Sequence, residues 1–365
     1  MCACGKKITA GYSLWVVAAV VILLVLGECG GVGATNTTHM AKSEFTLYGM
    51  FTQYMDSTTS FLNFDTRTWC NTTGFTGNTA NANNYPMPPA YYKEASEGPL
   101  HAVLAGMDGA RDTVLVDLNL DSCTYTATKV PSELYSLVGF VAAPKKDMWG
   151  YAYASPLTIY RVKAGPTGGP SLEGMEKVYV SPEYAPNIYP VYNPGADALL
   201  IVLRFGTGLS SILSVSTTSA WFRPLPDPSQ QADGTSVGVH AWDSNMKSMI
   251  TVETEYSIRT NGPITASLVA IDVGSPADNN TVVHPRVVHP LPVEWASLRA
   301  AGAAVDPVSN RYVYCGALPG TWDEGVISLG LGKSGPNPTI AYTVPGSPYT
   351  VVLAPVPSNL ARPAQ

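Results

Sequence analysis

The chain of 365 residues has a net charge of −6 and an isoelectric point near 5.4, so its charge gives no basis for binding nucleic acid or anionic membrane surfaces. Charged residues make up only 13% of the chain, about half the share usual in globular proteins. The 20 tyrosines, 33 glycines and 30 prolines indicate an all-β chain in which many turns join short strands.

The first 34 residues have the layout of a signal peptide. Lys6 and Lys7 precede an apolar run at residues 14–26, and the small residues 32–34 offer a cleavage site. The run is shorter than the ~20 residues that a membrane-spanning helix needs. An uncleaved signal anchor with the lysines on the cytoplasmic side is the alternative. In both cases the rest of the chain, after a linker at 35–44, faces the outside of the cell.

Strand patterns begin directly after the linker, at residues 45–51 and 60–65. Residues 70–99 are rich in Asn, Gly and Pro and predict a long surface loop. Residues 100–130 then supply a compressed unit of strands, in which 114–118 is the clearest. The N-terminal part of the mature chain is therefore expected to hold fewer regular strands than the rest.

Four more regular units follow, each made of four short strands. The predicted strands of these units are 134–143, 148–154, 157–163 and 177–180; 188–193, 199–205, 211–216 and 221–225; 237–241, 248–256, 267–273 and 281–288; and 303–305, 311–315, 325–330 and 339–344.

One phrase recurs in these units: an apolar run, a turn with Asp or Asn, and a second apolar run rich in aromatics. Its copies lie at 141–153, 191–203, 239–252 and 303–316, so the period is roughly 50 residues. A period of this length built of four strands predicts a single β-propeller of six four-stranded blades. We expect residues 349–354 to pair with the N-terminal strands and close the ring, which places the propeller at 45–355.

A flexible tail at 356–365 would follow the propeller. Seven blades are the alternative if residues 42–99 hold a complete unit of their own.

The mature part keeps three of the six cysteines, Cys70, Cys123 and Cys315. In an oxidising compartment we expect a disulfide between Cys70 and Cys123, which lie at strand edges in successive units, although the spacing leaves other pairings open. Cys315 lies within an apolar strand and is predicted to be a buried thiol. Three glycosylation sequons fit an exported chain and begin at Asn36, Asn71 and Asn279.

Two phrases carry a family resemblance. Residues 304–313 (Ala-Val-Asp-Pro-Val-Ser-Asn-Arg-Tyr-Val) and 268–272 (Leu-Val-Ala-Ile-Asp) resemble those of the YVTN-type and quinoprotein-like propellers. The resemblance implies the fold but transfers no function, because enzymes, binding modules and scaffolds share these turn and strand residues. Residues 97–99 (Glu-Gly-Pro) also resemble the opening of the metal site in gluconolactonase-like propellers, but Leu100 and His101 replace the Trp-Asp that follows there.

Each predicted connector between units carries an acid, and together these acids are the candidate site. In a propeller such connectors lie on one face around the central channel, where carboxylates could converge and bind Ca²⁺ or Mg²⁺. The plain alternative is that they are solvated loop residues. The acids are Glu97, Glu133, Glu183, Asp227 and Glu294.

Histidines and aromatic residues offer weaker candidates. His240, His284 and His289 are candidate ligands, but His284-Pro and His289-Pro recur around a turn, so a metal-binding role is the less favoured interpretation. The tyrosines and tryptophans could form a platform for a carbohydrate or a peptide, but core positions between blades are the favoured interpretation for most of them.

The sequence thus predicts an exported propeller that acts as a binding module at or outside the cell surface. Its partner would be an extracellular protein or glycan over the channel mouth, with no role for nucleic acid and no membrane contact beyond the N-terminal anchor. A metal-dependent hydrolase of lactones or esters that uses the same acids is the first alternative, and a passive wall or matrix component is the second.

Overall fold

The computed structural model describes residues 45–53, 58–63, 66–77, 87–94, 98–145, 148–181, 190–204, 210–226, 235–237, 239–257, 262–275, 281–295, 302–306, 309–321, 323–344 and 350–357. The chain divides into two compact units, Met1–Lys42 and Ser43–Gln365, and all of the described residues belong to the second. The predicted signal peptide and its cleavage site therefore lie outside the described residues.

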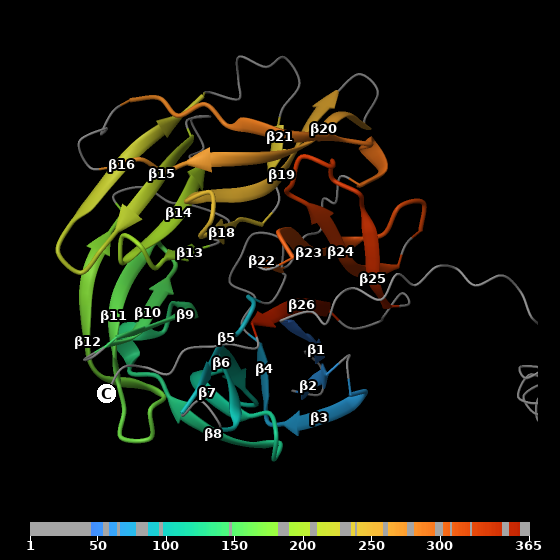
Figure 1. Ribbon diagram of the computed structural model, residues 1–365. Helices are drawn as coiled ribbons and strands as arrows, with labels where there is room; N and C mark the ends of the chain where they lie inside the picture. The colour runs from blue at the N-terminus through green and yellow to red at the C-terminus, as the bar shows by residue number, and fades with distance from the viewer. Residues whose placement is uncertain are drawn as a thin grey trace, which may run out of the picture. The chain divides into compact units, whose positions relative to one another are not determined.

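The described residues form six antiparallel sheets arranged in a ring, which we call blades 1 to 6 (Figure 1). Blade 1 contains, from the axis outward, β26 (Thr350–Pro357), β1 (Phe45–Gln53), β2 (Thr58–Asn63) and β3 (Thr68–Thr73). Blade 2 contains β4 (Phe75–Gly77) and β5 (Ala90–Lys93), which both pair with β6 (Leu100–Asp108), and then β7 (Thr113–Asn119) and β8 (Thr124–Lys129).

The next two blades have four consecutive strands each. Blade 3 contains β9 (Leu137–Lys145), β10 (Met148–Ala154), β11 (Thr158–Ala164) and β12 (Pro170–Val180). Blade 4 contains β13 (Pro190–Asn193), β14 (Ala198–Arg204), β15 (Ser210–Val215) and β16 (Ala220–Leu225).

Blade 5 again has a divided first strand, and blade 6 is regular. Blade 5 contains β17 (Thr235–Val237) and β18 (Ala241–Asp243), both paired with β19 (Ser248–Ser257), followed by β20 (Gly262–Asp272) and β21 (Arg286–Leu291). Blade 6 contains β22 (Gly302–Asp306), β23 (Arg311–Ala317), β24 (Glu324–Gly330) and β25 (Thr339–Val344).

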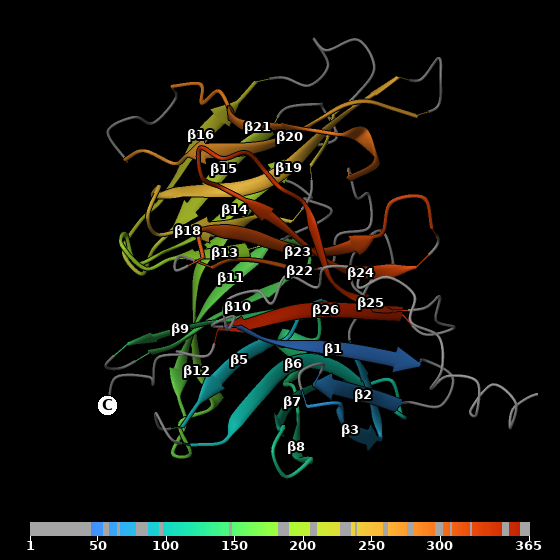
Figure 2. The same ribbon diagram turned by 45° about the vertical axis from the view of Figure 1, so that its right-hand side comes forward.

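The two ends of the propeller sequence meet in blade 1. β26 pairs with β1 in an antiparallel register that runs from Phe45 opposite Pro357 to Thr52 opposite Thr350, and the two strands lie side by side in Figure 2. Around the axis, first strands of neighbouring blades are in contact: β5 with β9, β9 with β13, β13 with β18, β18 with β22, and β22 with β26. The predicted ring closure by both termini is thus confirmed, as are the six blades.

The prediction of one long loop at residues 70–99 is wrong in part. Cys70 lies in β3, and both β4 and β5 fall within this segment and form the first strand of blade 2. A strand of three or four residues gives too short an alternation to stand out among Asn, Gly and Pro. Because residues 45–73 complete blade 1 and residue 75 begins blade 2, a seventh blade within 42–99 is excluded.

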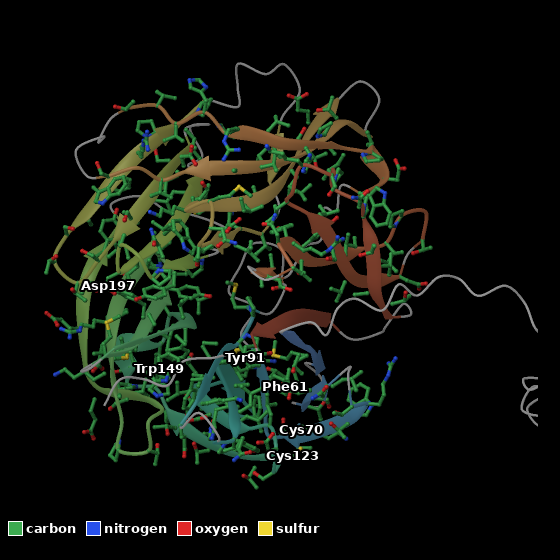
Figure 3. All side chains as sticks on the ribbon, viewed as in Figure 1. Phe61, Cys70, Tyr91, Cys123, Trp149 and Asp197 are labelled. Atoms are coloured by element: carbon green, nitrogen blue, oxygen red, sulfur yellow. The ribbon has the colours of Figure 1, made fainter. Side chains whose placement is uncertain are left out.

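Burial explains why the sequence of a second strand is apolar whereas that of an outermost strand is polar. All seven residues of β10 (Met-Trp-Gly-Tyr-Ala-Tyr-Ala) are buried, because neighbouring blades cover both faces of the sheet there. All six residues of β8 (Thr-Tyr-Thr-Ala-Thr-Lys) are exposed at the outer edge. Hydrophobic clusters fill the spaces between blades, with Phe61 and Tyr91 between blades 1 and 2, and Trp149 between blades 2 and 3 (Figure 3).

The recurring Asp or Asn of the sequence phrase forms the tight turn that follows the first strand. The Oδ1 atom of Asn193 accepts hydrogen bonds from the backbone of the β13–β14 turn, that of Asp243 does so in the β18–β19 turn, and that of Asp306 accepts one from Ser309 N at 3.2 Å. Such side chains replace the missing partners of turn amides. We call this end of the propeller the turn end.

The opposite end carries the segments that lead from the last strand of one blade to the first strand of the next, and we call it the connector end. Two of these segments contain a single-turn 3₁₀ helix, η2 (Ser132–Leu134) before β9 and η5 (Val293–Trp295) before β22. Within the ranges that the structure describes, no helix is long and apolar enough to cross a membrane.

Candidate functional site

Two of the five predicted acids lie within the described residues, and both are exposed at the connector end. Glu133 is the middle residue of η2, and Glu294 is the middle residue of η5. The structure thus gives these two acids equivalent places in blades 3 and 6.

The two 3₁₀ turns share one sequence pattern and one backbone bond. Each begins with a proline followed by one variable residue, the glutamate and an apolar residue, and in each the N–H of the apolar residue donates to the proline carbonyl. The distance is 2.8 Å from Leu134 N to Pro131 O and 3.0 Å from Trp295 N to Pro292 O. Proline fixes the φ of the first position, and the buried Leu134 anchors the turn in blade 3. The glutamates therefore project from a rigid backbone.

Glu97, Glu183 and Asp227 lie outside the described residues, so the convergence of all five acids stays a prediction. In the part of the chain that the structure describes, no group of three or more His, Cys, Asp or Glu residues is placed to hold a metal ion. Glu133 and Glu294 alone do not define a Ca²⁺ or Mg²⁺ site, since Ca²⁺ takes six to eight oxygen ligands.

The three histidines discussed from the sequence all lie in blade 5 or just before one of its strands. His240 is buried just before β18, and His284 is exposed just before β21. His289 lies in β21, with its Nε2 atom 2.8 Å from the carbonyl oxygen of Gly332 in the neighbouring blade. Trp149, Tyr151 and other aromatics lie in the core between blades. Among the described residues these histidines form no metal site together.

Sequence reasoning missed a polar cluster in blade 2, formed by Tyr92, Glu94, His101 and Asp117. The Nδ1 atom of His101 lies 2.8 Å from Oδ1 of Asp117, and the Tyr92 hydroxyl donates to Oδ2 of the same carboxylate at 2.7 Å. The Nε2 atom of His101 is buried and lies 3.6 Å from the Glu94 carboxylate. One partly buried carboxylate thus fixes both an imidazole and a phenol on neighbouring strands.

The cluster also joins blade 2 to blade 3. The β11–β12 turn of blade 3 passes so close that a Cβ atom on Gly169 would lie 2.6 Å from Oδ2 of Asp117 and 2.7 Å from the Tyr92 hydroxyl. Any larger residue would force the Asp117 carboxylate and the Tyr92 hydroxyl to move. The ring of Tyr92 also packs edge-on against Trp149, with centroids 5.8 Å apart. The one signal in the sequence was Asp117, an acid within the apolar strand at 114–118.

Replacing Tyr92 by phenylalanine is expected to change how stability depends on alkaline pH. Burial, followed by the charge of Asp117 and the hydrogen bond to it, raises the pKa of Tyr92 well above its usual value. The folded state therefore keeps the phenol neutral, whereas in the unfolded state the phenol ionises near pH 10. Its contribution to the free energy of unfolding is complete below about pH 10 and is lost as the pH rises. Above about pH 10, the free energy of unfolding measured with denaturant should fall with pH less steeply in Tyr92→Phe than in the wild type. The difference in slope should be about 1.4 kcal/mol per pH unit. Parallel curves for the two proteins would contradict this role.

The structure brings the two predicted disulfide partners together as free thiols (Figure 3). Cys70 is buried in β3 of blade 1, and Cys123 lies in the turn before β8 of blade 2. Burial raises the pKa of the Cys70 thiol, and its hydrogen bond with Cys123 raises that pKa further. The Cys123 Sγ–H also donates to the carbonyl oxygen of Trp69 at 3.9 Å. The contact between blades is as predicted, and the disulfide itself stays a prediction.

Of the three predicted glycosylation sites, only Asn71 lies within the described residues. Its side chain is exposed on β3, the outermost strand of blade 1. Asn36 and Asn279 lie outside the described residues, as does the side chain of Cys315, whose backbone is in β23 as predicted.

The fold and its connectors define a six-bladed β-propeller. No family model matches the sequence, and no curated protein matches it. Solved structures that resemble it include TolB from Acinetobacter baumannii, which is 11% identical and has a TM-score of 0.48. The match covers 86% of this chain and 67% of TolB. AofleA from Arthrobotrys oligospora is 9% identical and has a TM-score of 0.46, and the match covers 86% of this chain and 90% of AofleA.

A putative 6-phosphogluconolactonase from Bacteroides uniformis is 10% identical and has a TM-score of 0.35. The match covers 85% of this chain and 99% of the other. At these levels of identity the similarities concern the fold alone and transfer no activity to this chain.

Proposed function

We propose that this protein is an exported propeller that acts as a binding module, with an extracellular protein or glycan bound over the connector end. The observation that carries the proposal is the repeated turn that presents Glu133 and Glu294. Two blades use the same proline-led 3₁₀ turn, and each exposes a glutamate on it. Export is supported by the sequence of residues 1–34, with its paired lysines and apolar run.

Carboxylates held on a rigid rim favour partners that bring cationic groups. An exposed ion pair contributes at most about 1 kcal/mol, so two such pairs change affinity by roughly tenfold. Electrostatic complementarity of this kind also raises the association rate, and the gain falls as salt is added. The partner class is therefore a basic protein segment or a cationic glycan.

The test uses an oligolysine peptide and a chitosan oligosaccharide as probes for the secreted protein. We expect the wild type to bind at least one of them, and the double variant Glu133→Gln/Glu294→Gln to bind roughly tenfold more weakly. Glu173→Gln removes an exposed acid from β12 in blade 3 and is the matched control, which should keep wild-type affinity. Equal binding by all three proteins, or no binding by the wild type, would refute the proposal.

The metal-dependent hydrolase that shares these acids makes a different prediction. It requires a Ca²⁺ or Mg²⁺ ion bound at one per chain, and the ion would be lost in the same double variant. Metal analysis of the secreted protein therefore separates the two functions.

A further inference from the structure

A cleft of about 560 Å³ opens at the turn end, between blades 4 and 5. One wall is the β13–β14 turn with Asn193 and the residues that follow it, and the facing wall is the β18–β19 turn with Ser244 and Lys247. The indole of Trp242 and the start of the segment after β20, at Val273, complete the lining. This volume lies within the range of about 300–1,000 Å³ that is usual for small-molecule sites.

The walls of the cleft are firmly held. Asn193 is buried, and its Oδ1 atom accepts hydrogen bonds from Gly195 N at 3.0 Å and Ala196 N at 3.2 Å, which leaves the amide nitrogen for a ligand. Trp242 packs part of its indole against the hydrophobic cluster between blades 4 and 5 and keeps the rest accessible. A rigid aromatic surface therefore lies beside a polar group whose orientation the turn fixes.

Lys247 has an unusual backbone conformation for its residue type. The last residue of the tight turn has a positive φ in three blades, with 51° at Asp197, 54° at Lys247 and 53° at Asn310. Asp and Asn adopt this conformation readily, whereas a lysine does so at a cost of about 1 kcal/mol. Asp197 accepts a hydrogen bond from Tyr192 at 3.0 Å and so has a structural role in its own turn.

Among the residues that the structure describes, no carboxylate forms an ion pair with the ammonium group of Lys247. Asp243 directs its Oδ1 atom to the turn amides of Asn245 and Met246. The lining residues themselves include no acid. The cleft therefore presents a lysine without an ion pair next to an indole.

We propose that this cleft binds a small organic acid, namely a ring that carries a carboxylate. The ring face would stack on Trp242, the carboxylate would pair with Lys247, and Asn193 and Ser244 would contact polar substituents. Stacking on an indole suits either the apolar face of a sugar or an aromatic ring. Uronic acid sugars and aromatic acids share this chemistry, and the experiment distinguishes them.

Calorimetry with the full chain tests the proposal, using digalacturonate and phenylacetate as probes. We expect one of the two acids to bind and its neutral methyl ester to bind about fivefold more weakly, because the ion pair with the exposed Lys247 is lost. Saturation by digalacturonate alone identifies a sugar site, and saturation by phenylacetate alone identifies an aromatic-acid site. Failure of the wild type to bind either acid would overturn the proposal.

The variants are chosen so that the fold is kept. Lys247→Asn places in blade 5 the residue that blade 6 has at the equivalent position, so the turn is retained while the charge is removed. It should weaken binding of the acid about fivefold, and Trp242→Ala, which removes the stacking surface, should weaken it as well. Lys333→Gln removes an exposed lysine from the β24–β25 turn and is the matched control, which should bind as the wild type does. Unchanged affinity in Lys247→Asn would also overturn the proposal.

This site is independent of the one proposed at the connector end. Glu133→Gln/Glu294→Gln should leave binding of the organic acid unchanged, and Lys247→Asn should leave binding of the cationic probes unchanged. Each proposal can thus fail without affecting the other.

Discussion

Oxidation of Cys70 and Cys123 to a disulfide is expected to raise the free energy of unfolding by about 4 kcal/mol, because the bond would close a loop of roughly 50 residues. The hydrogen-bonded contact between the thiols shows that the two blades already hold them together. With oxidised glutathione as the oxidant, each thiol loses one hydrogen and two molecules of reduced glutathione are released. Denaturant unfolding of the oxidised and reduced protein measures the difference.

Cys70→Ser/Cys123→Ser is the matching variant. It should unfold at the same denaturant concentration with and without oxidised glutathione, whereas the wild type should shift. Intact mass should show the loss of two hydrogen atoms from the wild type alone. A wild-type protein of unchanged mass after prolonged oxidation would show that these thiols do not form the bond.

Removal of the last strand is expected to have the largest effect of all. A chain that ends at residue 344 lacks β26, so the edge of β1 loses its partner from Phe45 to Thr52, and β22 loses its contact across the closure. An open ring exposes the apolar surfaces between blades 6 and 1 as well as a free strand edge. Because typical stabilities are only about 5–15 kcal/mol, we expect no cooperative unfolding transition in this variant.

The control for this truncation ends at residue 357 and leaves β26 complete. Thermal unfolding followed by circular dichroism should give a wild-type transition for the control and a broad or absent one for the chain that ends at 344. A cooperative transition at the wild-type temperature in the shorter chain would show that the ring does not depend on this closure.

The sequence was sufficient for most of the propeller because its blades repeat one local rule. In blades 4, 5 and 6 the Asp or Asn at the end of the first strand caps a tight turn, and the apolar run after it becomes a buried second strand, as at Asp306 and in β23. These interactions span only a few residues, so a pattern in the sequence reveals them. The first strand of blade 2 escaped prediction because β4 and β5 are short and separated by residues 78–89.

The polar clusters and the cleft depend on residues that are farther apart in the sequence. His101 and Asp117 are on different strands of blade 2, and Gly169 reaches them from blade 3. No spacing rule connects three such positions. The glutamates at 133 and 294 were found because each follows a proline in a connector, while the cleft at Trp242 and Lys247 required the relative placement of two blades.

The pairing of β1 with β26 has a consequence for how the protein folds. The first strand of the propeller to be synthesised has its partner almost at the other end of the chain, so their contact has a very large sequence separation. Contacts of this kind slow folding, because the entropy of a long loop is lost before the contact forms. Until β26 arrives, β1 presents an open edge on which other chains can aggregate. We therefore expect refolding to be slow and its yield to fall as protein concentration rises, with ring closure as the final step.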